Sequence, residues 1–191
     1  MKIYTKDETK LHEEKIILKI LKGNLFIYPT DTIYGIGCNA KDNIAVKNLR
    51  DTKRQNTRPL SIIAPNKKWI YDNCIINPKI ETWIDKLPGP YTLILNLKNN
   101  KAIAQEVNLS NKTIGVRIPN NWFMEIIKKA NIPIITTSAN ITGENFVTNI
   151  EQLDENIKIN CSFSIDEGEK KGKPSTLIDL TSKEITIKER K

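Results

Sequence analysis

The 191-residue sequence has only three cysteines and one histidine, and this scarcity excludes several kinds of site. Cys38, Cys74 and Cys161 lie far apart and form no CxxC pair, so we expect neither a zinc site nor a disulfide framework, and we expect a reducing compartment. The single histidine, His12, falls on a predicted helix, and we expect it to have no catalytic role. A serine–histidine nucleophile is therefore excluded.

Long apolar runs and glycine-rich phosphate loops are also missing. No stretch approaches the roughly 18 apolar residues that span a bilayer, and the first residues lack the apolar core of a signal peptide. We therefore expect a cytoplasmic protein without a membrane partner. Neither GxxxxGK[ST] nor GxGxxG occurs, which excludes the common P-loop and dinucleotide-binding sites. Aromatic residues make up only 6% of the chain and do not cluster into a platform for stacking bases.

The remaining composition is that of one folded domain, which we place at residues 1–191. Apolar residues amount to 39% and charged residues to 27%, as in ordinary globular proteins. A formal net charge of +8 favours polyanionic ligands such as nucleotides or RNA. An overall abundance of lysine, asparagine and isoleucine explains the same charge equally well.

Apolar periodicity predicts helices and strands that alternate unevenly along the chain. Helices are expected at 12–22, 43–53, 69–73, 80–86 and 122–130, with Gly23 capping the first and Pro78 separating the third from the fourth. Strands are expected at 24–28, 60–64, 91–97, 113–118, 132–136, 177–180 and 185–188. This order indicates a mixed α/β (α+β) fold, with helices packed on one mixed sheet.

Five short polar segments interrupt the apolar strands and could line one cleft. They lie at 28–35, 53–58, 113–117, 136–140 and 173–176. Hydroxyl and amide groups bind ligands without committing charge, and an arginine fork holds a carboxylate or a phosphate through two parallel hydrogen bonds. Such a set suits an amino acid together with a nucleotide. Taken alone, each segment is better explained as a turn, a helix cap or a solvated charge run.

The order of these segments resembles that of a known family. YPTDTIYGIGCNA, RPLSII, LPGPYTLIL, TIGVRIP, TTSANITG and KPSTLIDLT follow one another from about residue 25 to residue 180, and they look like the signature segments of the YrdC family of threonylcarbamoyl-adenylate synthases. The resemblance implies a twisted open mixed sheet flanked by helices, with a concave basic cleft where ATP and threonine meet. The end of the chain at Lys191 suggests the short form of the family.

The resemblance also implies roles for individual residues. Residues expected to contact threonine are Thr32, Arg117, Thr136 and Ser175. Residues expected to contact ATP are Lys53, Arg54, Arg58, Thr113, Ser138, Asn140 and, in preference to Lys188, Arg190. The sequence departs from the family pattern twice, because Thr52 occupies the usual lysine position and Ile63 occupies the position where many members carry a histidine.

The activity implied is the synthesis of threonylcarbamoyl-adenylate from threonine, bicarbonate and ATP, without a covalent enzyme intermediate. Mg²⁺ is expected to accompany ATP without a dedicated protein cage. Expected partners are tRNA and the proteins of the threonylcarbamoyl-transferase complex. Two alternatives remain open: a module that binds double-stranded or transfer RNA without catalysis, and a paralogue that handles another carbamoyl-adenylate or has lost activity.

Overall fold

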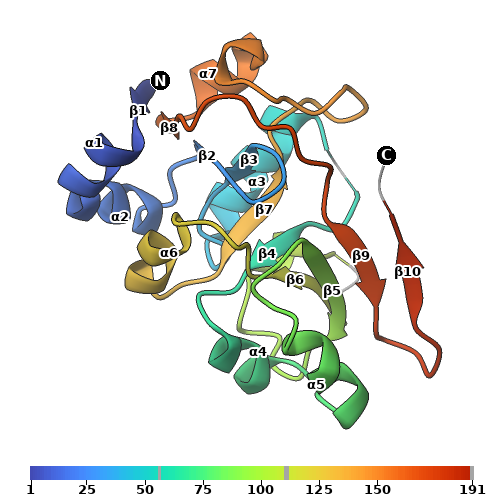
Figure 1. The fold of residues 1–191 in the computed structure, drawn as a ribbon. Coiled ribbons are helices and arrows are strands. Elements are labelled where there is room, and N and C mark those ends of the chain that lie inside the picture. The colour runs from blue at the N-terminus through green and yellow to red at the C-terminus, as the bar shows by residue number, and fades with distance from the viewer. Residues whose placement is uncertain (56, 110–111, 190–191) are drawn as a thin grey trace.

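A ten-stranded mixed sheet forms the frame of the molecule in the computed structural model, which describes residues 1–55, 57–109 and 112–189 (Figure 1). The strands are β1 (Lys2–Tyr4), β2 (Phe26–Tyr28), β3 (Gly35–Gly37), β4 (Ser61–Ile63), β5 (Tyr91–Asn96), β6 (Thr113–Arg117), β7 (Ile134–Ser138), β8 (Phe163–Ile165), β9 (Thr176–Asp179) and β10 (Thr186–Lys188). Their order in the sheet is β1-β8-β2-β3-β7-β4-β6-β5-β9-β10. Parallel pairs such as β4 with β6 occur beside antiparallel pairs such as β5 with β6, so the prediction of a mixed sheet is confirmed.

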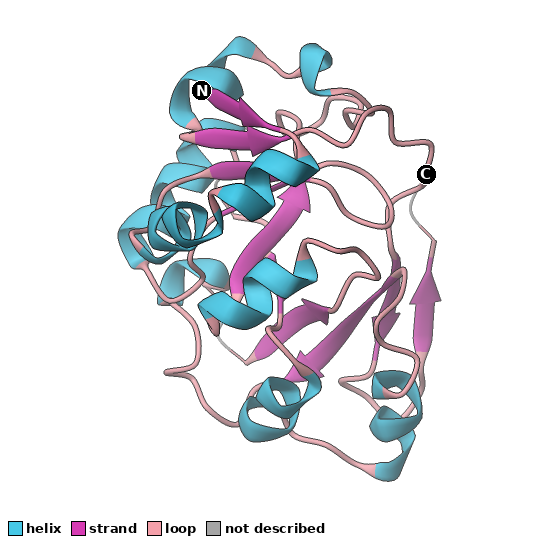
Figure 2. Ribbon diagram, turned by 60° about the vertical axis from the view of Figure 1, so that its left-hand side comes forward, coloured by secondary structure: helices cyan, strands magenta, loops and turns pink. Residues whose placement is uncertain are grey.

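Seven α-helices accompany the described strands. They are α1 (Lys6–Leu11), α2 (Glu13–Leu21), α3 (Asn43–Lys53), α4 (Lys67–Asn73), α5 (Pro78–Ile84), α6 (Met124–Ala130) and α7 (Glu155–Asn160). Helix α2 packs beside α6, and α3 packs beside α7. In Figure 2 the short strands near the N-terminus lie at the top and the strand pair near the C-terminus lies at the lower right.

Local chemistry explains where several helices begin and end. At the end of α2, Gly23 has a φ of 76°, and the N–H groups of Gly23 and Asn24 donate to the carbonyls of Ile20 and Lys19, which confirms the predicted glycine cap. The side chain of Asp42 caps α3 by accepting hydrogen bonds from the next turn. Pro78, expected to separate two helices, is instead the first residue of α5, where its missing N–H costs no hydrogen bond.

Among the α-helices and strands, five were not predicted from the sequence: β1, β3, β8, α1 and α7. Helix α1 begins with a capping box, in which Thr5 and Glu8 satisfy each other's backbone N–H groups. Strand β7 continues to Ser138, two residues beyond the predicted end. The predicted strand at 177–180 and the one at 185–188 form the antiparallel pair β9 and β10.

Aromatic side chains pack on β2 and β8. The rings of Phe26 and Phe163 stack with centroids 5.2 Å apart, and Tyr28 stacks on Phe123 with centroids 5.3 Å apart. These rings join β2 and β8 to the segment before α6, so the turn that follows β2 starts from a rigid base.

Candidate functional site

A cavity of about 400 Å³ gathers most of the polar segments singled out in the sequence. Side chains reach it from the turns after β2 and β7, from the end of α3, from the end of β6 and from the residues before β9. The lining residues are Thr30, Thr32, Ile33, Tyr34, Gly35, Lys53, Gln55, Arg58, Pro59, Ser61, Thr92, Arg117, Thr136, Thr137, Ser138, Asn140, Thr142, Gly143, Glu144, Phe146, Pro174 and Ser175. Three of these side chains are cations, Lys53, Arg58 and Arg117, and one, Glu144, is a carboxylate.

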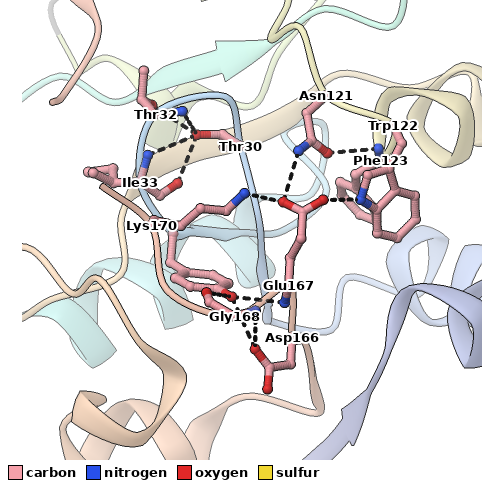
Figure 3. Close-up of polar contacts among 11 residues, drawn as sticks. Thr30, Thr32, Ile33, Asn121, Trp122, Phe123, Asp166, Glu167, Gly168 and Lys170 are labelled. Carbon is pink, nitrogen blue, oxygen red and sulfur yellow. Dashed lines mark hydrogen bonds and ion pairs between the residues drawn. The ribbon is translucent and has the colours of Figure 1, made fainter. Parts of the chain in front are cut away.

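The turn between β2 and β3 is held in shape by the side chain of Thr30. Its Oγ1 accepts hydrogen bonds from the N–H groups of Thr32 at 3.0 Å and Ile33 at 3.2 Å, and it donates to the carbonyl of Ile33 at 2.8 Å (Figure 3). The same oxygen lies 2.9 Å from Oγ1 of Thr32. A buried hydroxyl that closes its own turn fixes the direction of the next side chain, so Thr32 is held in the cavity wall.

Arg117, the last residue of β6, places its guanidinium in the same wall and is only 5% exposed. Its Nη2 pairs with Oδ1 of Asp31 at 2.5 Å, and its Nη1 lies 3.5 Å from Oγ1 of Thr32. The Nε atom has no hydrogen-bond partner among the described residues. Burial lowers the pKa of Arg117, and the charge of Asp31 opposes that shift. The second oxygen of Asp31 accepts the N–H of Asn120 at 3.0 Å.

Lys53 is the most buried cation in the described part of this wall, at 1% exposure. Its ammonium donates to the carbonyl of Ser138 at 2.6 Å and to the carbonyl of Asn140. Burial lowers the pKa of Lys53 from 10.5 to about 8. The lysine therefore braces the turn after β7 through two carbonyl oxygens.

Arg50 was not predicted from the sequence. It organises the segment after α3 that carries Arg54 and Arg58, which we call the basic loop. Its guanidinium is buried and donates to the carbonyls of Gln55 at 3.2 Å and Arg58 at 3.0 Å, both within this loop. It also donates to the carbonyls of Glu106 and Val107, which fastens the loop to the neighbouring segment. Arg50 lies on the buried face of α3 with Val46 and Leu49, and a cation on an apolar helix face is a signal that could have identified it.

Neutral polar groups complete the cavity. Nδ2 of Asn140 donates to the carbonyls of Ile141 and Glu144, each at 2.8 Å, while its Oδ1 is buried without a partner among the described residues. Oγ of Ser175 lies 2.7 Å from Oγ1 of Thr92. Thr30, Asp31, Gln55 and Thr92 were not predicted individually as binding residues. They nevertheless stand within segments noted in the sequence: Thr30 and Asp31 in YPTDT, Gln55 in 53–58 and Thr92 in LPGPYTLIL.

The structure brings together eight of the eleven residues that were expected to bind a substrate. They are Thr32, Lys53, Arg58, Arg117, Thr136, Ser138, Asn140 and Ser175.

The other expected residues lie elsewhere. Arg54 is exposed after α3, and Thr113 stands at the opposite end of β6 from Arg117, so neither lines the cavity as described. Arg190 lies outside the described residues, and Lys188 is exposed on β10. His12 lies at the junction between α1 and α2, away from the cavity lining.

Three further observations bear on what this chain holds. Within residues 1–55, 57–109 and 112–189, no three His, Cys, Asp or Glu side chains gather as metal ligands. Over the same ranges, no helix combines the length and apolarity needed to cross a bilayer. All three cysteines are buried and free, and burial raises the pKa of the Cys74 and Cys161 thiols to about 12.

Comparison with known proteins finds a family model and a relative that agree with each other. Residues 19–190 match the Sua5_yciO_yrdC family model, whose description reads "Telomere recombination". A Methanocaldococcus jannaschii protein named "Putative threonylcarbamoyl-AMP synthase" is 37% identical over 196 residues, which cover 99% of this chain and 91% of that protein.

Solved structures resemble the whole chain. Pyrococcus abyssi Sua5 complexed with L-threonine superposes with a TM-score of 0.86 at 27% identity, covering 97% of this chain and 56% of that one. A double variant of the same Sua5 gives a TM-score of 0.87 at 30% identity, covering 98% and 56%. Escherichia coli YciO gives 0.86 at 21% identity, covering 100% and 96%, and that likeness shows the fold. The chain thus spans just over half of each Sua5 structure.

Proposed function

This chain belongs to the Sua5–YciO–YrdC family, and from that premise we propose that it makes L-threonylcarbamoyl-adenylate from L-threonine, bicarbonate or CO₂, and ATP, with release of pyrophosphate. Support comes from a relative of similar length that is named for this activity and from a Sua5 structure complexed with L-threonine. The cavity described above is the proposed site.

The observation that carries the proposal is that Arg117 is buried with one donor unpaired among the described residues. Its guanidinium is buried in the cavity wall, its Nη2 is fixed by Asp31, and its Nε has no partner in the described protein. A buried charged donor without an acceptor is costly, and an anionic ligand would satisfy it. The carboxylate of an amino acid would accept a charge-assisted hydrogen bond from this Nε. The hydroxyls of Thr32 and Ser175 stand in the same cavity and would receive the rest of threonine.

The nucleotide is proposed to occupy the side of the cavity formed by the turn after β7 and the basic loop. Arg58 stands there as an exposed cation that lines the cavity, and Oδ1 of Asn140 remains without a partner among the described residues. Arg58 would meet the phosphates, while Ser138 and Asn140 would contact the nucleotide. ATP is proposed to arrive as its magnesium complex, since the described lining offers one carboxylate, Glu144, and Mg²⁺ commonly keeps water and phosphate oxygens as ligands.

The reaction would proceed in two steps. The threonine amine adds to CO₂ to give a carbamate and a proton, and a carbamate oxygen then forms a bond to the α-phosphorus of ATP while the bond to pyrophosphate breaks. The protein would contribute by holding the two substrates together and by neutralising the charge of the leaving group. Arg117 would position threonine, and Arg58 would stabilise the departing pyrophosphate.

The proposal extends to the cellular setting. Partner proteins of the threonylcarbamoyl-transferase complex would transfer the threonylcarbamoyl group from the adenylate to a tRNA adenosine beside the anticodon, with release of AMP. Direct contact of this chain with tRNA is part of the same proposal. We place the reaction in the cytoplasm, which agrees with three cysteines that carry no disulfide.

A direct assay tests the activity. The purified protein is incubated with ATP, Mg²⁺, ¹⁴C-bicarbonate and L-threonine, and both pyrophosphate and a labelled adenylate are measured. We expect each product to depend on threonine and on bicarbonate, with L-valine as the matched control that keeps the shape of threonine but lacks its hydroxyl.

Other outcomes distinguish the alternatives. Pyrophosphate release with another amino acid would favour a paralogue that handles a different adenylate. Binding of tRNA with a steep salt dependence and no pyrophosphate release would favour an RNA-binding module and would overturn the proposed activity.

A further inference from the structure

The segment 166–175, which we call the strap, connects β8 to β9 and runs across the molecule in Figure 1. Six strands separate β8 from β9 in the order of the sheet, so the strap must bridge that width. It ends at Ser175, which lines the cavity and packs its hydroxyl against Thr92. The placement of the strap therefore decides whether this part of the cavity wall is complete.

One acidic side chain, Glu167, fastens the strap to the turn that follows β6. Its carboxylate accepts a hydrogen bond from Nε1 of Trp122 at 2.5 Å and from Nδ2 of Asn121 at 3.3 Å, and it pairs with the ammonium of Lys170 (Figure 3). Partial burial alone would raise the pKa of Glu167, but the contacts with Lys170, Trp122 and Asn121 outweigh it and lower the pKa. The charged carboxylate is thus the form that the site favours.

A second tie joins the same part of the strap to the cavity wall. The Tyr34 hydroxyl accepts the N–H of Glu167 at 2.9 Å and donates to the carbonyl of Gly168 at 2.7 Å. Tyr34 itself lines the cavity just before β3. Further along the strap, the backbone of Gly172 lies so close to Thr32 that a Cβ there would clash with the Thr32 carbonyl oxygen. The strap thus touches the threonine-rich turn directly.

We propose that Glu167 is a positioning residue, whose contacts with Trp122, Asn121 and Lys170 hold the strap so that Ser175 completes the cavity wall. The carboxylate does not reach the cavity lining, so it acts through the strap and not on a substrate. The catalytic consequence rests on the proposed function, whereas the docking of the strap does not.

Limited proteolysis tests the docking without any substrate. Trypsin can cut after Lys170 and Lys171, whereas the bond after Lys173 precedes a proline. Cleavage of a native protein follows the population of its opened form. Glu167→Gln and Trp122→Phe should raise the rate of cleavage about tenfold or more, because each removes a charge-assisted hydrogen bond. Glu169→Gln removes the same charge from an exposed position on the same strap and should leave the rate unchanged.

The kinetic arm uses the same three variants. In the adenylate assay, Glu167→Gln and Trp122→Phe should raise the KM for threonine about tenfold while kcat changes less, and Glu169→Gln should match the wild type. Circular dichroism establishes which variants are folded, and Trp122→Phe, which keeps an aromatic ring, decides the matter if Glu167→Gln fails to fold. If a folded Glu167→Gln or Trp122→Phe variant is cleaved at the same rate as Glu169→Gln, the proposal is overturned. If the wild type makes no adenylate, yet Glu167→Gln and Trp122→Phe are cleaved faster than the wild type, the proposed function alone is refuted.

Discussion

The side chains of Arg117 and Asp31 form an ion pair with 2.5 Å between Nη2 and Oδ1, and both are largely withdrawn from solvent, at 6% and 12% exposure. Asp31 also accepts the N–H of Asn120, so one carboxylate fixes the guanidinium and the turn after β6 together. This arrangement leaves the Nε atom of the arginine without a partner among the described residues. The aspartate therefore sets the orientation in which Nε of Arg117 is available for a ligand.

Removing Asp31 should destabilise the protein. Asp31→Asn leaves the buried guanidinium without its counter-charge, so we expect the free energy of unfolding to fall by about 3 kcal/mol, as measured by urea denaturation at neutral pH. Asp72→Asn is the matched control, because Asp72 pairs with Lys68 on the surface of α4. If the free energy of unfolding falls equally in the two variants, the buried Arg117–Asp31 pair contributes no more to stability than the surface pair.

Removing Arg117 should affect threonine far more than ATP. Arg117→Ala takes away the Nε donor proposed for the carboxylate together with the charge of the guanidinium, and we expect the KM for threonine to rise by an amount equivalent to about 2 to 4 kcal/mol. The binding of ATP, followed separately by calorimetry, should change little. A parallel loss of affinity for both substrates would contradict the assignment of Arg117 to the amino acid.

The two arginines of the basic loop should differ in their importance for ATP. Arg58 lines the cavity, whereas Arg54 is exposed beside it. We expect Arg58→Ala to raise the KM for ATP about tenfold, through loss of a phosphate contact, and Arg54→Ala to have a smaller effect. If Arg54→Ala is the more damaging variant, the loop must rearrange when the nucleotide binds.

Lys53 should make stability depend on pH in the alkaline range. Because its pKa is about 8 in the folded protein and 10.5 is the ordinary value, the unfolded chain binds more protons than the folded chain between these two values. The cost of burying the ammonium is thus fully present below about pH 8 and is relieved as the pH rises. We expect the free energy of unfolding of the wild type to increase relative to Lys53→Met between about pH 8 and pH 10.

The control for this titration is Lys47→Met, which removes an exposed lysine from the same helix. Urea denaturation of the three proteins at several pH values gives the differences directly. A difference between wild type and Lys53→Met that stays constant with pH would show that the Lys53 ammonium carries no burial cost.

Sequence patterns predicted the helices and strands that carry their own signals. The predicted helix at 43–53 matches α3, and the structure adds the cap at Asp42, which fixes where this helix begins. The missed strands β1, β3 and β8, of three residues each, gave no such signal: β3 reads Gly-Ile-Gly, and glycine is disfavoured in strands. Strand β8 depends on pairing with β1 and β2, which are far away in sequence. Helix α1 was predictable in principle, because Thr5 and Glu8 have the spacing of a capping box.

The cavity, too, was predictable from the sequence only in part. The ordered segments identified most of its residues, since each stands at the end of a strand or a helix. The segments could not reveal the contacts of individual side chains: Lys53 binds two carbonyls, Arg117 pairs with Asp31, and Arg50 donates to the basic loop. These contacts arise from the path of the backbone in three dimensions, and local sequence does not encode them. The role of Glu167 is hidden for the same reason, because Trp122 lies 45 residues earlier in the chain.

The pairing of β1 with β8 has a consequence for biosynthesis. Residues 2–4 leave the ribosome long before their hydrogen-bonding partners at 163–165 have been translated. In a nascent chain, β1 therefore waits with its backbone groups unpaired by β8 while all the strands between them in sequence are made, and this edge of the sheet can close only after β8 has emerged.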